Sequence, residues 1–147
     1  MKKLLLMMMF ISGGVSAHSH APTEFGGNAT DDDFINEALT INGIQQVPIT
    51  ITNLNKYPQQ YDVVVEKVNI DKATGELEIL STKVAGQTSI VYPNDFRKLP
   101  ITVQMDQGDW NKPVTYKVCS ISVANDGDMF RSKICTLAKL YWKKDTF

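Results

Sequence analysis

The most regular feature of this chain is the alternation of apolar and polar residues with a period of two. Apolar residues stand at every second position of 47–52, separated by proline and threonine, and 61–66 has a similar pattern. Such alternation predicts β-strands, because successive side chains of a strand point to opposite faces. No window shows the sustained 3.6-residue period of an amphipathic helix. Further short β-branched segments lie at 77–80, 89–92, 99–105, 114–123 and 129–142.

These segments predict the fold class. About seven short strands in succession are typical of an all-β, immunoglobulin-like antiparallel β-sandwich, which we expect over residues 37–147. We see no internal repeat and no linker, so we expect a single domain. Residues 18–36 contain glycines, a proline and three consecutive aspartates without an apolar period. We therefore expect a flexible N-terminal arm there.

The last hairpin carries a prediction of register. Asn125-Asp126-Gly127-Asp128 is the strongest turn signal in the chain. Cys119 and Cys135, the only cysteines, lie eight positions on either side of Gly127, so a turn centred there places them opposite each other. We predict a disulfide between them, which requires a closely spaced cross-strand pair. Two buried free thiols are the alternative.

The N-terminus has the organisation of a secretory signal peptide. Lys2 and Lys3 precede the apolar run Leu4–Ile11, and small residues lead to a cleavage point after Ala17. A membrane anchor is the alternative, but eight apolar residues are too few to cross about 30 Å of hydrocarbon. We therefore expect residues 1–17 to be removed and the protein to reach the periplasm, or to be secreted, without a membrane span. An even cysteine count in an exported chain also favours the disulfide.

Charge and side-chain chemistry exclude several functions. The chain has 15 Lys+Arg against 16 Asp+Glu, which argues against binding to nucleic acid. It has no nucleophile elbow, paired His–Asp set or phosphate-binding glycine loop, so we expect no enzyme and no catalytic residues. The expected mature start His18-Ser19-His20 offers one metal hypothesis. Its amine, two amides and the imidazole of His20 form a square-planar set that suits Cu(II); otherwise we expect no cofactor.

Several segments resemble one protein family. Residues 47–53 (VPITITN) are similar to the "xVTN" strand of periplasmic pilus assembly chaperones of the chaperone–usher pathway, and residues 90–97 (IVYPNDFR) resemble their "IVxPPxxFR" segment. Residues 116–121 resemble the strand of their "WLNVxxIP" stretch, and 133–143 (KICTLAKLYWK) their last first-domain strand, which ends "xxKLFYRP". The motifs occur in the family's order and extend from about residue 37 to 144. The resemblance covers the N-terminal immunoglobulin-like domain of that family, in a divergent, single-domain form.

The resemblance implies a binding mechanism and specific residues. In that family the final strand completes the unfinished sheet of a pilus or surface-fibre subunit, a form of strand addition, and the outer-membrane usher is a further partner. Lys139 matches the lysine that grips the carboxyl terminus of the subunit. Phe130, Ser132 and Ile134 occupy the alternating donor positions, although Ser132 departs from their apolar character. Glu37 stands where the family has a second, arginine anchor.

We therefore expect a periplasmic chaperone-like protein that captures fimbrial subunits through an exposed C-terminal edge strand. A stand-alone exported immunoglobulin-like structural or adhesive protein is one alternative. A small periplasmic copper-binding protein, with His18 and His20 as ligands, is another. The mechanism depends on one structural condition, namely that the final strand lies at an open edge of its sheet.

Overall fold

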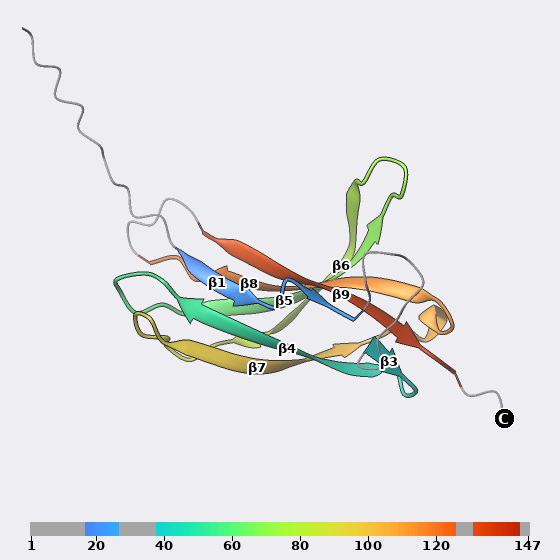
Figure 1. The fold of residues 1–147 in the computed structure, drawn as a ribbon, viewed down its shortest axis with the longest axis horizontal. Helices are drawn as coiled ribbons and strands as arrows, with labels where there is room; N and C mark the ends of the chain where they lie inside the picture. Colours follow the sequence, from blue (N-terminus) through green and yellow to red (C-terminus); the bar gives the residue numbers. More distant parts are fainter. Residues whose placement is uncertain (1–16, 27–37, 126–130, 145–147) are drawn as a thin grey trace, which may run out of the picture.

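The computed structural model describes residues 17–26, 38–125 and 131–144, which form two packed β-sheets (Figure 1). Within these residues no helix has the length and apolar character needed to span a bilayer. The strands are β1 (His18–Ala21), β2 (Glu24–Phe25), β3 (Leu39–Thr40), β4 (Ile44–Asn53), β5 (Tyr61–Ile70), β6 (Leu77–Gln87), β7 (Phe96–Gln104), β8 (Pro113–Ser122) and β9 (Lys133–Trp142), with a 3₁₀ turn at Gln107–Asp109.

The two sheets have different compositions. The first has the strand order β1-β4-β7 and is antiparallel. The second has the order β2-β9-β8-β5-β6, and β3 also pairs with β9. Its long strands are antiparallel, whereas β2 and β3 run parallel to β9. The immunoglobulin-like sandwich is thus confirmed, with nine strands in the described residues. Three short strands, β1 to β3, add to the expected set, whereas the strand expected at 89–92 is wrong: only Val91 forms an isolated bridge there, with Gln59.

The core lies between the sheets, where the predicted alternation places it. In β4 the apolar residues Val47, Ile49 and Ile51 are buried, and β5 contributes Tyr61, Val63 and Val65 in the same way. Burying such a side chain contributes about 1.5–3 kcal/mol relative to exposure. The remaining core residues are Val91, Ile101, Val103, Met105, Val114, Tyr116, Val118, Ala138 and Leu140.

The structure corrects the prediction of a flexible arm in its first part. β1 pairs with β4 from His18↔Asn53 to Ala21↔Thr50, and β2 then pairs with β9 in the other sheet. The N-terminal segment therefore crosses from one sheet to the other. Histidine counted as polar in the periodicity, yet His18 and His20 are both buried, because a neutral imidazole can be buried when its nitrogens find partners. Residues 27–37 of the expected arm and residues 1–16 of the expected signal peptide lie outside the described residues.

The register of the last hairpin agrees with the prediction. Cys119 is paired with Cys135 across β8 and β9, and the two form a disulfide with their Cα atoms 4.0 Å apart. This short distance is typical of the closely spaced, non-hydrogen-bonded pairs of an antiparallel ladder. Gly127, on which the prediction was centred, lies outside the described residues.

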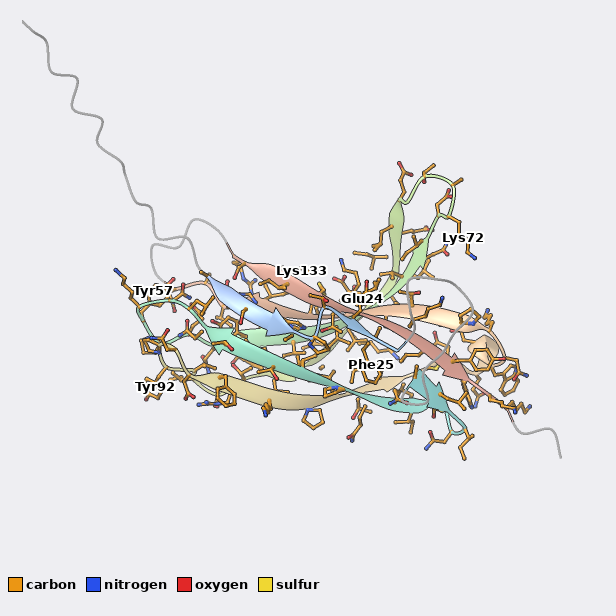
Figure 2. All side chains as sticks on the ribbon, in the orientation of Figure 1. Glu24, Phe25, Tyr57, Lys72, Tyr92 and Lys133 are labelled. Carbon is orange, nitrogen blue, oxygen red and sulfur yellow. A yellow bond between two sulfur atoms is a disulfide. The ribbon has the colours of Figure 1, made fainter. Side chains whose placement is uncertain are left out.

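The β5–β6 hairpin extends away from the sandwich (Figure 1). Lys72, in the turn of this hairpin, is labelled in Figure 2. Its ladder has two irregularities, between Val63 and Val64 and between Lys67 and Val68. Such irregularities increase local bending and twist. Every residue of β6 is exposed.

Candidate functional site

The two sides of β9 differ. On one side β9 pairs with β8 along nearly its whole length, from Lys133↔Ile121 to Tyr141↔Pro113. On the other side, β2 pairs at Leu137 and Ala138, and β3 pairs at Tyr141 and Trp142. Among the described residues, no strand pairs with the outer side of 133–136. The predicted open edge is therefore present in the first part of β9 and covered in the second.

The backbone at this open segment is oriented for strand addition. The N–H of Leu137 donates to the carbonyl of Thr23 at 2.8 Å, on the side away from β8, and the carbonyl of Ser132 accepts from the N–H of Ser122, toward β8. Because backbone groups alternate in direction along an antiparallel strand, Lys133 and Cys135 turn their N–H and C=O groups toward the open side. An incoming strand would pair with these groups.

The structure gives the predicted donor residues different surroundings. Ile134 is half-buried. Ser132 lies two positions away on the same face, and its Oγ lies 2.6 Å from Nδ1 of His18. Its side chain is thus bonded within its own sandwich. Phe130 lies outside the described residues.

Lys139 lies in the covered part of β9. It is half-buried and stands opposite Thr115 of β8. The β2 contact ends at Ala138 and the β3 contact begins at Tyr141, so Lys139 falls between them. It is therefore separated along the strand from the open segment. Glu37, which occupies the second anchor position in the resemblance, lies outside the described residues.

A buried network of histidines and hydroxyls joins β1 to β8 and β9, and the sequence interpretation missed it. Oγ of Ser120 lies 2.9 Å from Nε2 of His18 and 2.7 Å from Nδ1 of His20. Nε2 of His20 lies 2.7 Å from Oγ1 of Thr136, which also donates to the carbonyl of Pro22 at 2.5 Å. The network therefore fixes the N-terminal strand against the edge strand. The sequence contained one signal for it: His18 and His20 are two positions apart and therefore lie on the same face of a strand.

The surroundings of the histidines favour their neutral forms. Burial, with the charge of His18 adding to it, lowers the pKa of His20 to about 4. Burial also lowers the pKa of His18, although a hydrogen bond to the Ser120 backbone offsets part of the effect. The ring of His18 also packs against Tyr61, with the ring centroids 4.8 Å apart. These interactions make the pair a structural element that is stable when uncharged.

This arrangement does not fit the predicted copper site. A square-planar site needs the imidazole of His20 to turn back onto the backbone of its own segment. Instead, both ring nitrogens of His20 lie within hydrogen-bond distance of hydroxyls, and His18 and His20 belong to a strand paired with β4. In the described part of the chain, no group of three or more His, Cys, Asp or Glu side chains is placed to hold a metal. In this conformation the imidazole of His20 is engaged with hydroxyl groups, and the copper site at His18 and His20 stays a prediction.

Lys133, labelled in Figure 2, is the first residue of β9, and its side chain connects the open segment to β5. Its Nζ lies 2.5 Å from Oε1 of Glu66 in β5, and Nζ of Lys117 in β8 lies 3.8 Å from Oε2 of the same carboxylate. The side chain of Glu66 is only 5% exposed. Together with the Cys119–Cys135 disulfide, these ion pairs hold the start of β9 against its neighbours.

Comparisons with known proteins identify the class of fold. No protein-family model matches the chain, and no curated protein matches it. Among solved structures, the chain is similar to the class 5 fimbrial chaperone CfaA, with 12% identity and a TM-score of 0.58 over 88% of this chain and 58% of that one. It is also similar to a chain of the CsuC–CsuE chaperone–tip adhesion subunit complex of Acinetobacter baumannii, with 12% identity and a TM-score of 0.52 over 87% and 58%.

A human protein shares the architecture. PapD-like domain 7 of CEP192 is 7% identical, with a TM-score of 0.52 over 99% of both chains. At such low identities the likeness shows the fold alone. The described residues therefore have a pilus-chaperone-like, or PapD-like, fold, which agrees with the resemblance in the motifs. The chain spans about 58% of the length of the CfaA chain.

Proposed function

We propose that this protein is a periplasmic chaperone-like binding protein that captures a pilus or fimbrial subunit by strand addition at β9. The observation that carries the proposal is that, among the described residues, no strand pairs with the outer side of 133–136 in β9. The pilus-chaperone-like fold supports it. Export through residues 1–17, and an outer-membrane usher as a second partner, belong to the same proposal. The intact mass of the exported protein tests the cleavage site, with His18 as the expected first residue.

In this mechanism the open segment is a rigid template. A strand of the subunit pairs with the outward N–H and C=O groups of Lys133 and Cys135. The ordering cost of binding is small for this side of the interface, because the disulfide and the Glu66–Lys133 ion pair already fix the segment. Ile134 supplies apolar contact on the inner face. Lys139 is the candidate to bind a carboxylate of the subunit.

The sharpest test removes one outward N–H group. Lys133→Pro deletes an N–H that takes no part in the ladder with β8, so the fold is preserved while the edge is blocked. Lys133→Ala is the matched control, because it also loses the ion pair with Glu66 but keeps the N–H. Both are co-expressed in the periplasm with a pilus subunit that aggregates when expressed alone, and the one-to-one complex is quantified.

The expected result is that Lys133→Ala retains capture and Lys133→Pro loses most of it. Circular dichroism and thermal unfolding establish that both variants are folded. Equal capture by the two variants would show that the outward backbone of β9 is not the binding site. Lys139→Ala is measured in parallel, and unchanged capture by this variant would remove the carboxylate-binding role from Lys139.

A further inference from the structure

β6 is the second edge of the sheet that contains β9, at the opposite end of the strand order. It pairs with β5, and within the described residues no strand pairs with its other side. The outer part of its hairpin stands clear of the sandwich (Figure 1), so a second strand has unobstructed access to it. Natural proteins usually protect such an edge by shortening, covering or charging it.

This edge is long and carries large apolar residues. All eleven residues of β6 are exposed. They include Leu77, Ile79, Leu80 and Val84, and the exposed fractions of Leu80 and Val84 are 53% and 78%. Apolar side chains in such a row are typical of a surface that is covered by a partner.

The register shift in β6 determines which of its side chains share a face. Ser81 lies opposite Lys67, whereas Ile79 lies opposite the adjacent Val68, so Leu80 is an extra residue in β6. An uninterrupted strand would place residues 78 and 83 on opposite faces, because their separation is odd. The extra residue brings Glu78 and Lys83 to the same face. In the same way it puts Leu77, Ile79, Thr82 and Val84 together on the other face.

The resulting pattern is complementary to itself. A second β6 can pair antiparallel about a two-fold axis that passes between Leu80 and Ser81. Glu78 of each copy then stands opposite Lys83 of the other, and Leu77 stands opposite Val84. Each of these opposed pairs, and Ile79 opposite Thr82, lies on a common face, as antiparallel pairing requires. A two-fold interface repeats each of these contacts, so the pairing contains two ion pairs and two apolar pairs.

We infer that the protein self-associates through β6, with a second copy of this chain as the occupant of the edge. The two copies form one continuous sheet in the order β5-β6-β6-β5. The charge complementarity favours a second copy as the partner, because in a single register Glu78 of each copy lies opposite Lys83 of the other. Among the described contacts, neither Glu78 nor Lys83 makes an ion pair within its own chain. The interface leaves β9 free for a different partner.

Charge reversal provides the test. Glu78→Lys places two lysines opposite each other in both halves of the interface, and Lys83→Glu does the same with two glutamates. The double variant restores opposite charges throughout. Sedimentation velocity over a range of concentrations, at low and moderate ionic strength, measures the dimer dissociation constant of the mature chain. Glu76→Lys, a reversal just outside the strand in the same hairpin, is the matched control.

We expect the wild type and Glu76→Lys to dimerise alike, and each single reversal within β6 to raise the dissociation constant by about tenfold or more. The double variant should recover most of the loss. A wild type that stays monomeric at its highest soluble concentration would overturn the inference. So would a dimer that is indifferent to the single reversals, or a double variant that is as weak as either single variant.

Discussion

The two edge strands of the larger sheet, β9 and β6, differ in how firmly they are held against the rest of the molecule. β9 is fixed on one face by a buried histidine–hydroxyl network, on the other by a disulfide and the Glu66 ion pairs, and along part of its outer side by β2 and β3. β6 pairs only with β5 among the described strands, and every residue of β6 is exposed. Exposure of backbone groups alone therefore does not define the character of an edge. The packing behind the strand decides whether it is a rigid template or a projecting ribbon.

This difference has a physical consequence for binding. A strand that is already fixed loses little conformational entropy when a partner pairs with it. A projecting hairpin with few tertiary contacts has low local stability and gains order from its partner. We therefore expect β9 to act as a fixed template and β6 to become ordered by association.

The largest expected effect compares one leucine in each edge strand. Leu140 in β9 is fully buried, whereas Leu80 in β6 is 53% exposed. Leu140→Ala should lower the free energy of unfolding by about 2–5 kcal/mol, because it leaves a cavity in the core. Leu80→Ala should change it by no more than about 0.5 kcal/mol at monomeric concentrations. Urea unfolding followed by circular dichroism measures both, and similar losses would contradict the proposed contrast.

A second prediction concerns how the stability of the fold depends on pH through His20, which contacts β9. The pKa of His20 is about 4 in the folded chain and 6.5 in the unfolded chain. Above pH 6.5 the imidazole is neutral in both states. Between pH 6.5 and 4 the unfolded chain binds a proton that the folded chain does not, so stability falls as the pH drops, by at most about 3 kcal/mol. The lowered pKa of His18 acts in the same direction.

Urea unfolding at intervals from pH 7 to pH 4 measures this loss. His20→Gln keeps polar groups in the network but cannot titrate, and should therefore show a shallower decline over this window. Identical slopes for the wild type and the variant would mean that His20 does not contribute to the pH dependence.

The smallest expected effect compares two glutamates. Glu66→Gln removes the carboxylate from between Lys117 and Lys133 and should cost about 1 kcal/mol, because both lysines retain part of their hydration. Glu78→Gln in β6 should leave the stability of the monomer unchanged within about 0.5 kcal/mol. Thermal unfolding at low protein concentration measures the change in stability of each variant. Equal changes in stability would show that the ion pairs of Glu66 stabilise the fold no more than an exposed charge does.

Local patterns in the sequence predicted much of the sandwich. The alternation at 47–52 and 61–65 identified core strands, since burying one face of a strand requires that period. The turn around Gly127 predicted the pairing of Cys119 with Cys135, which the structure contains. The motif at 133–143 identified a final strand, which begins at Lys133 as β9.

Other features could not be read from the sequence because they depend on distant contacts. His18 and His20 become interior residues only when Ser120 and Thr136, about a hundred positions away, supply their partners. The irregularity at Leu80 depends on how β6 meets β5. It alone brings Glu78 and Lys83 to one face.

By itself, then, the sequence determined the class of fold, the succession of most main strands along the chain and the covalent link between the last two, because periodicity and turn chemistry act over short distances along the chain. The tertiary structure decided which part of β9 is open, how the histidines are used and what the free edge of β6 presents. These depend on which segments meet in space. A period of two shows that a residue faces one side of a sheet, but not what lies there.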